Sequence, residues 1–126
     1  MLNRDEKTHL AYADKSLNES IEKTAKEENL IYKKGFGLCN EVFDVYLSEE
    51  QFQEMLERLP KNLNFMATEM EAFALFYIAN MLGKKAACLL TLVDSRYQPK
   101  KYVSSEERET KLDNMIQIAL KTSLKL

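Results

Sequence analysis

Apolar residues recur with helical spacing in four segments of the chain. In the first segment, Leu17, Ile21 and Ala25 fall on one face, and a capping box of Ser16 and Glu19 predicts that the helix begins at Ser16. The second predicted helix follows a capping box of Ser48 and Gln51, ends before Pro60 and carries the apolar stripe Phe52, Met55, Leu56 and Leu59. The third lies after Glu69 and before Gly83, and its stripe is Met70, Phe73, Ala74, Tyr77, Ile78 and Met81. The fourth follows Ser104 and Glu107, and its stripe is Leu112, Met115, Ile116 and Ala119. Each stripe has a start or stop signal, so four helices are expected.

Three segments between these helices predict β-strands. Residues 30–38 form a strand that Gly35 and Gly37 interrupt, which favours a bulge or the close approach of a ligand. Residues 64–68 predict a short strand. Residues 86–93 are apolar on both faces, as in a strand of a parallel sheet that helices cover on both sides. The alternation of helices and strands predicts a layered α/β fold whose small sheet needs its edges covered.

The composition is that of one globular domain. The chain has 126 residues and a mass of 14.7 kDa, with 45% hydrophobic and 30% charged residues, which excludes a disordered tail. No apolar stretch approaches the ~20 residues of a membrane span, and the N-terminus has no signal-peptide core. The formal net charge of -2 disfavours phosphate-driven binding to nucleic acid. Neither a membrane nor a nucleic acid is therefore an expected partner.

Cysteine, histidine and glycine are scarce, and this scarcity makes a metal site or a glycine-rich phosphate-binding loop unexpected. Two cysteines and one histidine cannot build a zinc site without carboxylates, so no metal is expected, and the cysteines fit a reduced cytoplasmic protein. The chain has three glycines, where an average usage of ~7% corresponds to about nine. Neither a G-x-G-x-x-G nor a G-x-x-x-x-G-K-[ST] motif is present, so no phosphate-cradling loop is predicted.

Acidic residues follow two of the predicted strands, at the sheet edge where open α/β folds bind ligands. Glu69 and Glu71 stand after the second predicted strand, and two interpretations of them are open. The helix dipole favours acids in a first helical turn, and a glutamate in this place can also grip two sugar hydroxyls. Asp94 directly follows the third predicted strand, either as a turn residue or as a general acid that Arg108 tunes and orients.

Several motifs resemble the bacterial, hexameric type of purine nucleoside phosphorylase. They are Ala-Thr-Glu-Met-Glu-Ala at 67–72, Gly-Lys-Lys-Ala at 83–86, Leu-Thr-Leu-Val-Asp at 90–94, the closing segment 106–120, and the upstream segments 12–17 and 35–43. The Thr-Glu-Met-Glu-Ala motif is shared with related nucleosidases and uridine phosphorylases, whereas Glu107, Arg108 and residues 113–116 favour the purine enzymes. Members of the family are much longer. The chain looks like their C-terminal half, a single partial domain over residues 1–126.

The resemblance implies a fold, a reaction and a set of substrate contacts. The fold is a truncated three-layer αβα fold of the α/β class, with a small mixed or parallel sheet flanked by helices. The reaction splits a purine nucleoside with phosphate into a free base and ribose 1-phosphate, with phosphate as co-substrate and no other cofactor. Glu71 matches the glutamate that binds ribose hydroxyls, and Met70 matches the methionine that lies under the sugar. Glu69 stands in the same substrate-binding motif, and Leu38 falls where the family has a phenylalanine that stacks on the base.

The resemblance also implies two catalytic residues. Asp94 matches the aspartate that protonates the purine ring nitrogen as the base leaves, and a proton donor of raised pKa lowers the barrier for such a poor leaving group. Arg108 matches the arginine that approaches this aspartate, and residues 95–103 between them depart from the family's threonine-rich loop. The family's glycine-rich phosphate loop and phosphate-binding arginines belong to the half of the fold that this chain does not resemble.

Two classes of function stay open on the sequence. One is a purine nucleoside phosphorylase-like chain that holds the base- and ribose-binding half of the active site, which a separate chain completes if the enzyme is active. The other is a catalytically inactive remnant that binds nucleosides weakly or associates with itself. A purine nucleoside is the expected small-molecule partner. Half of a sheet exposes apolar edges, so a homo-oligomer, most simply a two-fold dimer, is also expected.

Overall fold

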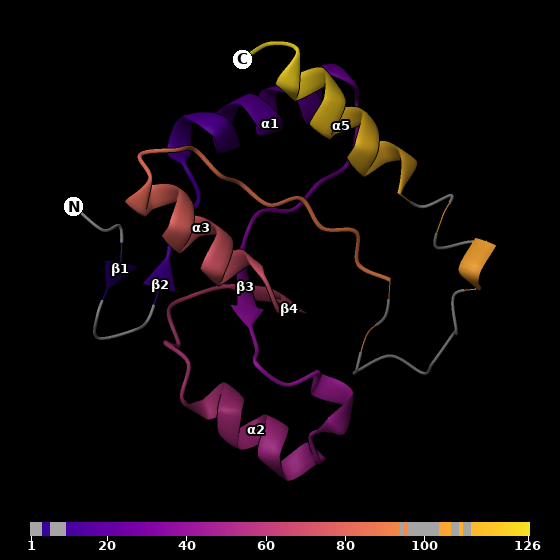
Figure 1. Cartoon of the computed structure of the whole chain (residues 1–126). Helices are drawn as coiled ribbons and strands as arrows, with labels where there is room; N and C mark the ends of the chain where they lie inside the picture. Colours follow the sequence, from indigo (N-terminus) through magenta and orange to yellow (C-terminus); the bar gives the residue numbers. More distant parts are fainter. Residues whose placement is uncertain (1–3, 6–9, 94, 96–103, 107–108, 110–111) are drawn as a thin grey trace. The chain divides into compact units, whose positions relative to one another are not determined.

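The computed structural model describes residues 4–5, 10–93, 95, 104–106, 109 and 112–126. The chain forms two compact units, and Figure 1 follows it through both of them. The first unit comprises Met1–Asp14 and Lys33–Ala86, and the second comprises Lys15–Tyr32 and Ala87–Leu126. Each unit has its own pair of packed elements at its centre, a parallel strand pair in the first and a helix pair in the second.

The centre of the first unit is a parallel pair of strands, β3 (Phe36–Cys39) and β4 (Phe65–Glu69). The chain passes from one to the other through the short 3₁₀ helix η1 (Asp44–Tyr46) and the helix α2 (Glu49–Glu57) (Figure 1). Parallel neighbours need a crossover of this kind, because a tight turn reverses the chain direction. The α/β class and the small parallel sheet predicted from the sequence are confirmed.

The first predicted strand is shorter than expected. It begins at Phe36 instead of residue 30, because residues 30–35 have no strand partner, and Ile31 is fully exposed. The predicted bulge is confirmed, since the register of β3 against β4 shifts between Phe36 and Gly37. At Gly35 the close approach is made by Asn64 and Met66 of the same chain. A Cβ at Gly35 would lie 2.8 Å from the backbone oxygen of Asn64, so a side chain does not fit there.

The helix α2 begins and ends where the sequence signals predict. Its capping box is formed in both directions, with the Gln51 N–H donating to Ser48 Oγ at 3.2 Å and the Ser48 N–H donating to Gln51 Oε1 at 2.9 Å. Phe52, the first residue of its apolar stripe, is buried. The helix ends at Glu57, three residues before Pro60, which cannot continue a helix.

The helix α3 (Ala72–Met81) begins three residues later than predicted, because Glu69 is still the last residue of β4. Its C-terminus confirms the predicted glycine stop. Gly83 has a φ of 63°, a left-handed conformation that glycine adopts without a Cβ clash. The Lys84 N–H then donates to the Ala79 oxygen at 2.8 Å and closes the last turn.

A small antiparallel hairpin in the first unit was not predicted. It pairs β1 (Arg4–Asp5) with β2 (Leu10–Ala11), and β2 contacts α3. Strands of two residues are too short to show an alternating pattern, so sequence periodicity does not detect them. The hairpin and α3 are seen together in Figure 1.

The second unit is built on a pair of helices, α1 (Lys15–Glu27) and α5 (Asp113–Ser123), which lie side by side (Figure 1). Among the described residues of this unit, the buried side chains are Thr24, Ala25, Ile118 and Thr122. The predicted cap of the first helix is wrong, because Lys15 is already helical and Ser16 therefore lies inside the first turn. The Ser16 carbonyl instead accepts a hydrogen bond from the Ser20 hydroxyl at 3.0 Å.

The last predicted helix is interrupted, and its buried face differs from the predicted one. Leu112 lies in a turn, and α5 begins after it. Ile118 is buried at 6% exposure, whereas Ile116 and Ala119 of the predicted stripe are exposed. The apolar residues between Met115 and Leu120 cover a wider part of this helix than one neighbouring helix can bury, so their spacing alone does not select a face. The contact with α1 selects it.

The predicted strand at residues 86–93 is wrong for the structure described here. No strand is formed between residues 84 and 93, and the sheet of β3 and β4 has two strands in the part of the chain that is described. A strand needs a hydrogen-bonded neighbour, and apolar residues on both faces do not supply one. Exposure along the segment still alternates, because Leu90 and Leu92 are 49% and 62% exposed and Thr91 between them is half-buried.

Two lysines of the α5 end join the second unit's helices by ion pairs. Lys125 pairs with Glu27, and Lys121 pairs with Glu28. The hydrogen bond from Lys125 is the main cause that lowers the pKa of the Glu27 carboxyl, and the charges of Lys125 and Lys23 act in the same direction. Burial opposes this effect, but the pKa remains below the usual value. The charged form of Glu27 is thus the one that the folded state favours.

The ion pair between Lys125 and Glu27 predicts that the folded state loses stability as the pH falls. A carboxyl whose pKa is lower in the folded than in the unfolded state contributes stability above its unfolded pKa, and that contribution is lost as the pH falls through the folded pKa. We expect Lys125→Met to lower the thermal midpoint near neutral pH and to reduce its fall on acidification, as followed by circular dichroism. Lys15→Met is the control, since its pair with Glu19 is exposed and lies within α1. Identical acid profiles for wild type and Lys125→Met would contradict the assignment.

Candidate functional site

The candidate site lies at the carboxyl ends of the parallel strands β3 and β4, where open α/β sheets bind ligands. Four of the residues predicted to contact substrate are described there: Leu38, Glu69, Met70 and Glu71. Leu38 comes from β3, Glu69 ends β4, and the other two join β4 to α3. Asp94 and Arg108, the residues predicted to be catalytic, lie outside the described residues.

The strand register separates Leu38 from Glu69. Leu38 pairs with Thr68, and Cys39 pairs with Glu69. Because successive side chains of a strand point to opposite faces, Leu38 and Thr68 share one face of the sheet, and Cys39 and Glu69 share the other. Gly37 belongs to the second face, and a Cβ there would lie 3.6 Å from Glu69 Cγ. The two predicted substrate contacts are therefore close in the fold but lie on opposite faces of the strand pair.

The Glu69 carboxylate caps the helix α3 from the end of β4. Its Oε2 accepts hydrogen bonds from the Glu71 N–H at 2.8 Å and from the Ala72 N–H at 2.5 Å. The first N–H groups of a helix have no partner inside the helix, and a negative charge is favoured beside them. Of the two interpretations that the sequence left open, an acid favoured at the start of a helix is the one that the contacts of Glu69 fit.

Met70 and Glu71 are two neighbouring residues of the motif that are exposed to solvent. Met70 is 42% exposed, and the Glu71 side chain is exposed as well. The described residues provide no hydrogen bond or ion pair to the Glu71 carboxylate, whereas that of Glu69 is engaged. An exposed carboxylate accepts hydrogen bonds from two neighbouring hydroxyls, and the thioether beside it offers an apolar surface.

Cys39 lies beside this segment as a protonated thiol. Partial burial is the main cause that raises its pKa, and the hydrogen bond and negative charge of Glu69 raise it further. A hydrogen bond from the Phe73 backbone acts in the opposite direction without reversing the effect. A thiol with a raised pKa forms less of the nucleophilic thiolate. Cys39 is partly buried, and Cys88, the other cysteine, is exposed.

Asn40 is a residue at this edge that the sequence analysis left out. It follows β3 directly, and its backbone N–H donates to the Glu69 oxygen at 2.8 Å. Its Nδ2 is shielded from solvent and has no hydrogen-bond partner among the residues that the structure describes. A shielded donor without an acceptor costs about 1–3 kcal/mol. The rule that selected Asp94, a polar residue directly after a strand, did not select Asn40, because the predicted strand ends at residue 38 and the observed one at Cys39.

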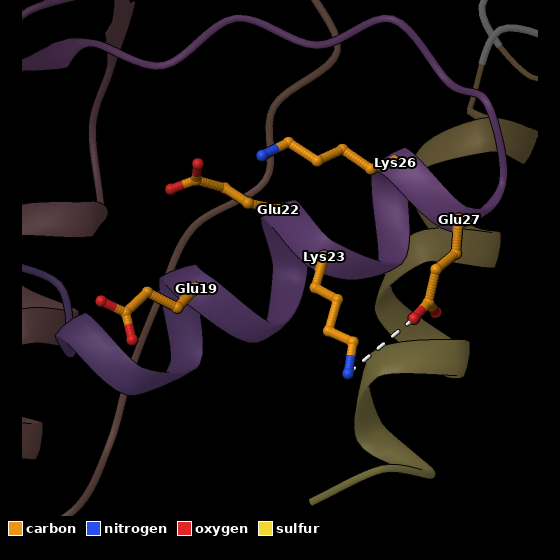
Figure 2. A pocket seen from close by; sticks show the side chains of 5 residues that line it. All are labelled: Glu19, Glu22, Lys23, Lys26 and Glu27. Atoms are coloured by element: carbon orange, nitrogen blue, oxygen red, sulfur yellow. Dashed lines mark ion pairs between the residues drawn. The ribbon is translucent and has the colours of Figure 1, made fainter.

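A shallow pocket elsewhere on the molecule contains none of the predicted site residues. It is lined by five side chains of α1, as Figure 2 shows: Glu19, Glu22, Lys23, Lys26 and Glu27. Lys23 and Glu27 are one turn apart, with Lys23 Nζ 4.0 Å from Glu27 Oε1, and both are largely exposed. Charges of opposite sign at this spacing are typical of the solvent face of a helix. The pocket is therefore a shallow depression between charged side chains of α1.

The described residues hold neither a metal-binding cluster nor a membrane-spanning helix. They contain no group of three or more histidine, cysteine or carboxylate side chains arranged to hold a metal ion. They also contain no helix that is both long enough and apolar enough to cross a bilayer. What the described part of the site offers is hydrogen bonding by carboxylates and apolar contact by methionine and leucine.

Comparison with known proteins assigns the chain to a family. The family model described as Phosphorylase superfamily matches residues 4–125. The chain belongs to the Phosphorylase superfamily, and this confirms the resemblance that was drawn from the motifs.

Several curated proteins that the chain resembles are named as purine nucleoside phosphorylases. The chain is 34% identical over 117 residues to a purine nucleoside phosphorylase DeoD-type of Mycoplasma genitalium, with 93% of this chain and 46% of the relative covered. It is 32% identical over 116 residues to a purine nucleoside phosphorylase DeoD-type 2 of Vibrio parahaemolyticus, covering 92% and 46%. For a DeoD-type enzyme of Shewanella loihica the identity is 29%, with the same coverage. The chain thus spans about half the length of the curated relatives that it matches.

Proposed function

We propose that this chain binds the ribose and base of a purine nucleoside at the carboxyl ends of β3 and β4, and that it serves phosphorolysis in an assembly whose other part binds phosphate. The observation that carries the proposal is the exposed Glu71 carboxylate beside Met70, without a partner among the described residues. It stands at the edge where open α/β sheets bind ligands. The chain's relatives are named as purine nucleoside phosphorylases.

The binding step follows from the chemistry of these side chains. The two carboxylate oxygens of Glu71 accept hydrogen bonds from the vicinal hydroxyls of ribose, which a deoxyribose or a free base cannot both supply. Met70 packs its thioether against the apolar face of the sugar. Leu38, on β3, provides apolar contact for the base. Glu69 is part of the same segment and holds the start of α3.

The chemical step needs a proton for the leaving base. A purine anion leaves poorly, so a general acid that protonates a ring nitrogen lowers the barrier. We assign this role to Asp94, and we assign to Arg108 the role of stabilising and orienting Asp94 as the base departs. Phosphate attacks the anomeric carbon as co-substrate, the bond from that carbon to the base breaks, and ribose 1-phosphate and the free base are formed. No metal or organic cofactor enters this scheme.

The second candidate is a catalytically inactive chain that binds nucleosides weakly. Its support is the scarcity of glycine, three in the whole sequence, together with the lack of a glycine-rich motif that cradles phosphate. In this case Leu38, which has no ring to stack on a base, gives low base affinity. The two candidates share the ribose contact and differ in turnover.

Calorimetry and a phosphorolysis assay on the purified chain separate the candidates. We expect inosine to bind saturably, and we expect inorganic phosphate alone to give no saturable heat below a Kd of about 1 mM, roughly -4 kcal/mol. Release of hypoxanthine from inosine and phosphate by the chain alone would show that its own residues complete the enzyme. Absence of any inosine binding would contradict both candidates. The exposed Glu54→Ala variant in α2 is the matched control for folding.

Self-association is a separate prediction from the apolar surface. Among the described residues the buried hydrophobic side chains are Ala25, Phe52 and Ile118, while many larger ones stay exposed, such as Ile78 and Leu82 at 55% and 66%. Exposed apolar area beyond a few hundred Å² tends to become an interface. We expect a homo-oligomer, most simply a two-fold dimer, in a reduced cytoplasmic setting. Light scattering at micromolar concentration measures this, and a monomeric mass would contradict it.

A further inference from the structure

Glu69 connects three elements of the first unit. Its backbone oxygen accepts the Asn40 N–H that follows β3, at 2.8 Å, and its own position ends β4. Its side chain reaches the start of α3, where Oε2 accepts the N–H groups of Glu71 and Ala72 at 2.8 and 2.5 Å. The N-cap residue of α3, Glu71, makes no capping hydrogen bond with its own side chain. Glu69 therefore does the capping that the N-cap residue leaves undone.

The Glu69 side chain is also separated from the face on which Leu38 lies. It shares the opposite face with Cys39, and its Cγ is 3.6 Å from the place of a Cβ on Gly37, so its stem lies over β3. Glu69 Oε2 thus accepts hydrogen bonds from backbone N–H groups, whereas the side chain of Glu71, two residues later, is exposed.

From these contacts we propose that Glu69 is a positioning residue that acts on the nucleoside through Glu71. By accepting the Glu71 N–H, it fixes the Glu71 backbone at φ -127° and ψ -26°, which lie outside helical values. The backbone conformation sets the direction in which the Glu71 side chain leaves the chain. A carboxylate must be aligned with both hydroxyls to bind them together. The role of Glu69 rests on the proposed function, in which Glu71 binds ribose.

A double-mutant cycle tests the positioning role. If Glu69 acts through Glu71, Glu69→Ala breaks the alignment, loses about one charge-assisted hydrogen bond and raises the Kd for inosine about ten-fold. The same change has no further effect in a Glu71→Ala background, because the group it positions is gone. Binding of hypoxanthine, which lacks ribose, does not change. Additive effects of the two substitutions would show that Glu69 contacts the nucleoside independently and would overturn the proposal.

Conservative variants and amide signals keep the test decisive if Glu69→Ala does not fold. Glu69→Gln retains an acceptor oxygen and restores most of the affinity, whereas Glu69→Asp, one methylene shorter, does not reach both N–H groups. In nuclear magnetic resonance spectra, the Glu71 and Ala72 amide protons shift upfield in Glu69→Asp and stay in place in Glu69→Gln and in the Glu54→Ala control.

Different results would contradict the proposed nucleoside binding and the positioning role of Glu69. If the wild type binds inosine and the cycle is additive, the proposed function stands and the positioning role is wrong. If the wild type binds no inosine, the proposed function is wrong, and the amide signals alone decide whether Glu69 holds Glu71. Unmoved Glu71 and Ala72 signals in Glu69→Asp would overturn the positioning role in either case.

Discussion

Asp94→Asn is expected to lower the rate of phosphorolysis by a factor of about 10²–10⁴ in any assembly of this chain that cleaves inosine. The asparagine keeps the shape and the hydrogen-bonding capacity of the aspartate but has no carboxyl proton to give to the purine ring. The bond between base and ribose then breaks without protonation of the leaving group. The loss appears in kcat, because the proton transfer belongs to the transition state and contributes little to binding of the nucleoside.

The measurement is the initial rate of hypoxanthine release, with inosine affinity followed in parallel. Glu54→Gln is the matched control, since it makes the same change from carboxylate to amide at an exposed position of α2. We expect the control to keep both rate and affinity. An Asp94→Asn variant with the rate of the active wild type would exclude Asp94 as the general acid, although the family assignment would stand.

Local signals in the sequence predicted the parts of the fold that local interactions determine. The capping box of Ser48 and Gln51 and the left-handed Gly83 involve residues within a few positions of one another. Such features depend on the side chain and backbone of one turn, and tertiary contacts do not need to select them. The strand at residues 64–68 was also predicted, with a shift of one residue at each end.

Features that depend on distant partners were the ones predicted wrongly. Residues 86–93 have the composition of a buried strand, but a strand exists only where another strand pairs with it. The buried face of α5 is selected by α1, nearly a hundred residues away in the chain. The β1–β2 hairpin has too few residues for any periodicity. In each case the deciding contact is absent from the local pattern.

The candidate site shows the same division. The motif and the strand-end rule located Glu69, Met70 and Glu71 correctly at the end of a strand and the start of a helix. They did not predict that Glu69 and Leu38 lie on opposite faces, because that depends on the register of β3 against β4. A shift of one residue exchanges the faces of a strand, and the bulge between Phe36 and Gly37 is what sets the register here. Register is a pairing property that one strand's sequence does not contain.

Glu71→Ala is expected to weaken the binding of inosine by about 10²–10⁴-fold, with a smaller effect on folding than on binding. Two charge-assisted hydrogen bonds to ribose hydroxyls are lost, each worth ~1.5–3 kcal/mol, and every ~1.4 kcal/mol is a ten-fold change in Kd. The free protein tolerates the change, because the exposed Glu71 carboxylate has no partner among the described residues and Glu69 still caps α3. The helix start therefore keeps its hydrogen bonds.

Titration calorimetry with inosine, 2′-deoxyinosine and hypoxanthine tests this prediction by comparing the Kd values of the three ligands. The wild type should lose affinity in steps along this series, since the first change removes one hydroxyl and the second removes the sugar. In Glu71→Ala the differences between the three ligands should collapse, because the group that distinguishes them is missing. Glu71→Gln should fall between the two proteins, since its amide accepts with one oxygen only. If Glu71→Ala binds inosine as tightly as the wild type while Glu54→Ala behaves the same, ribose is held by other residues, and the site proposed at the ends of β3 and β4 is wrong.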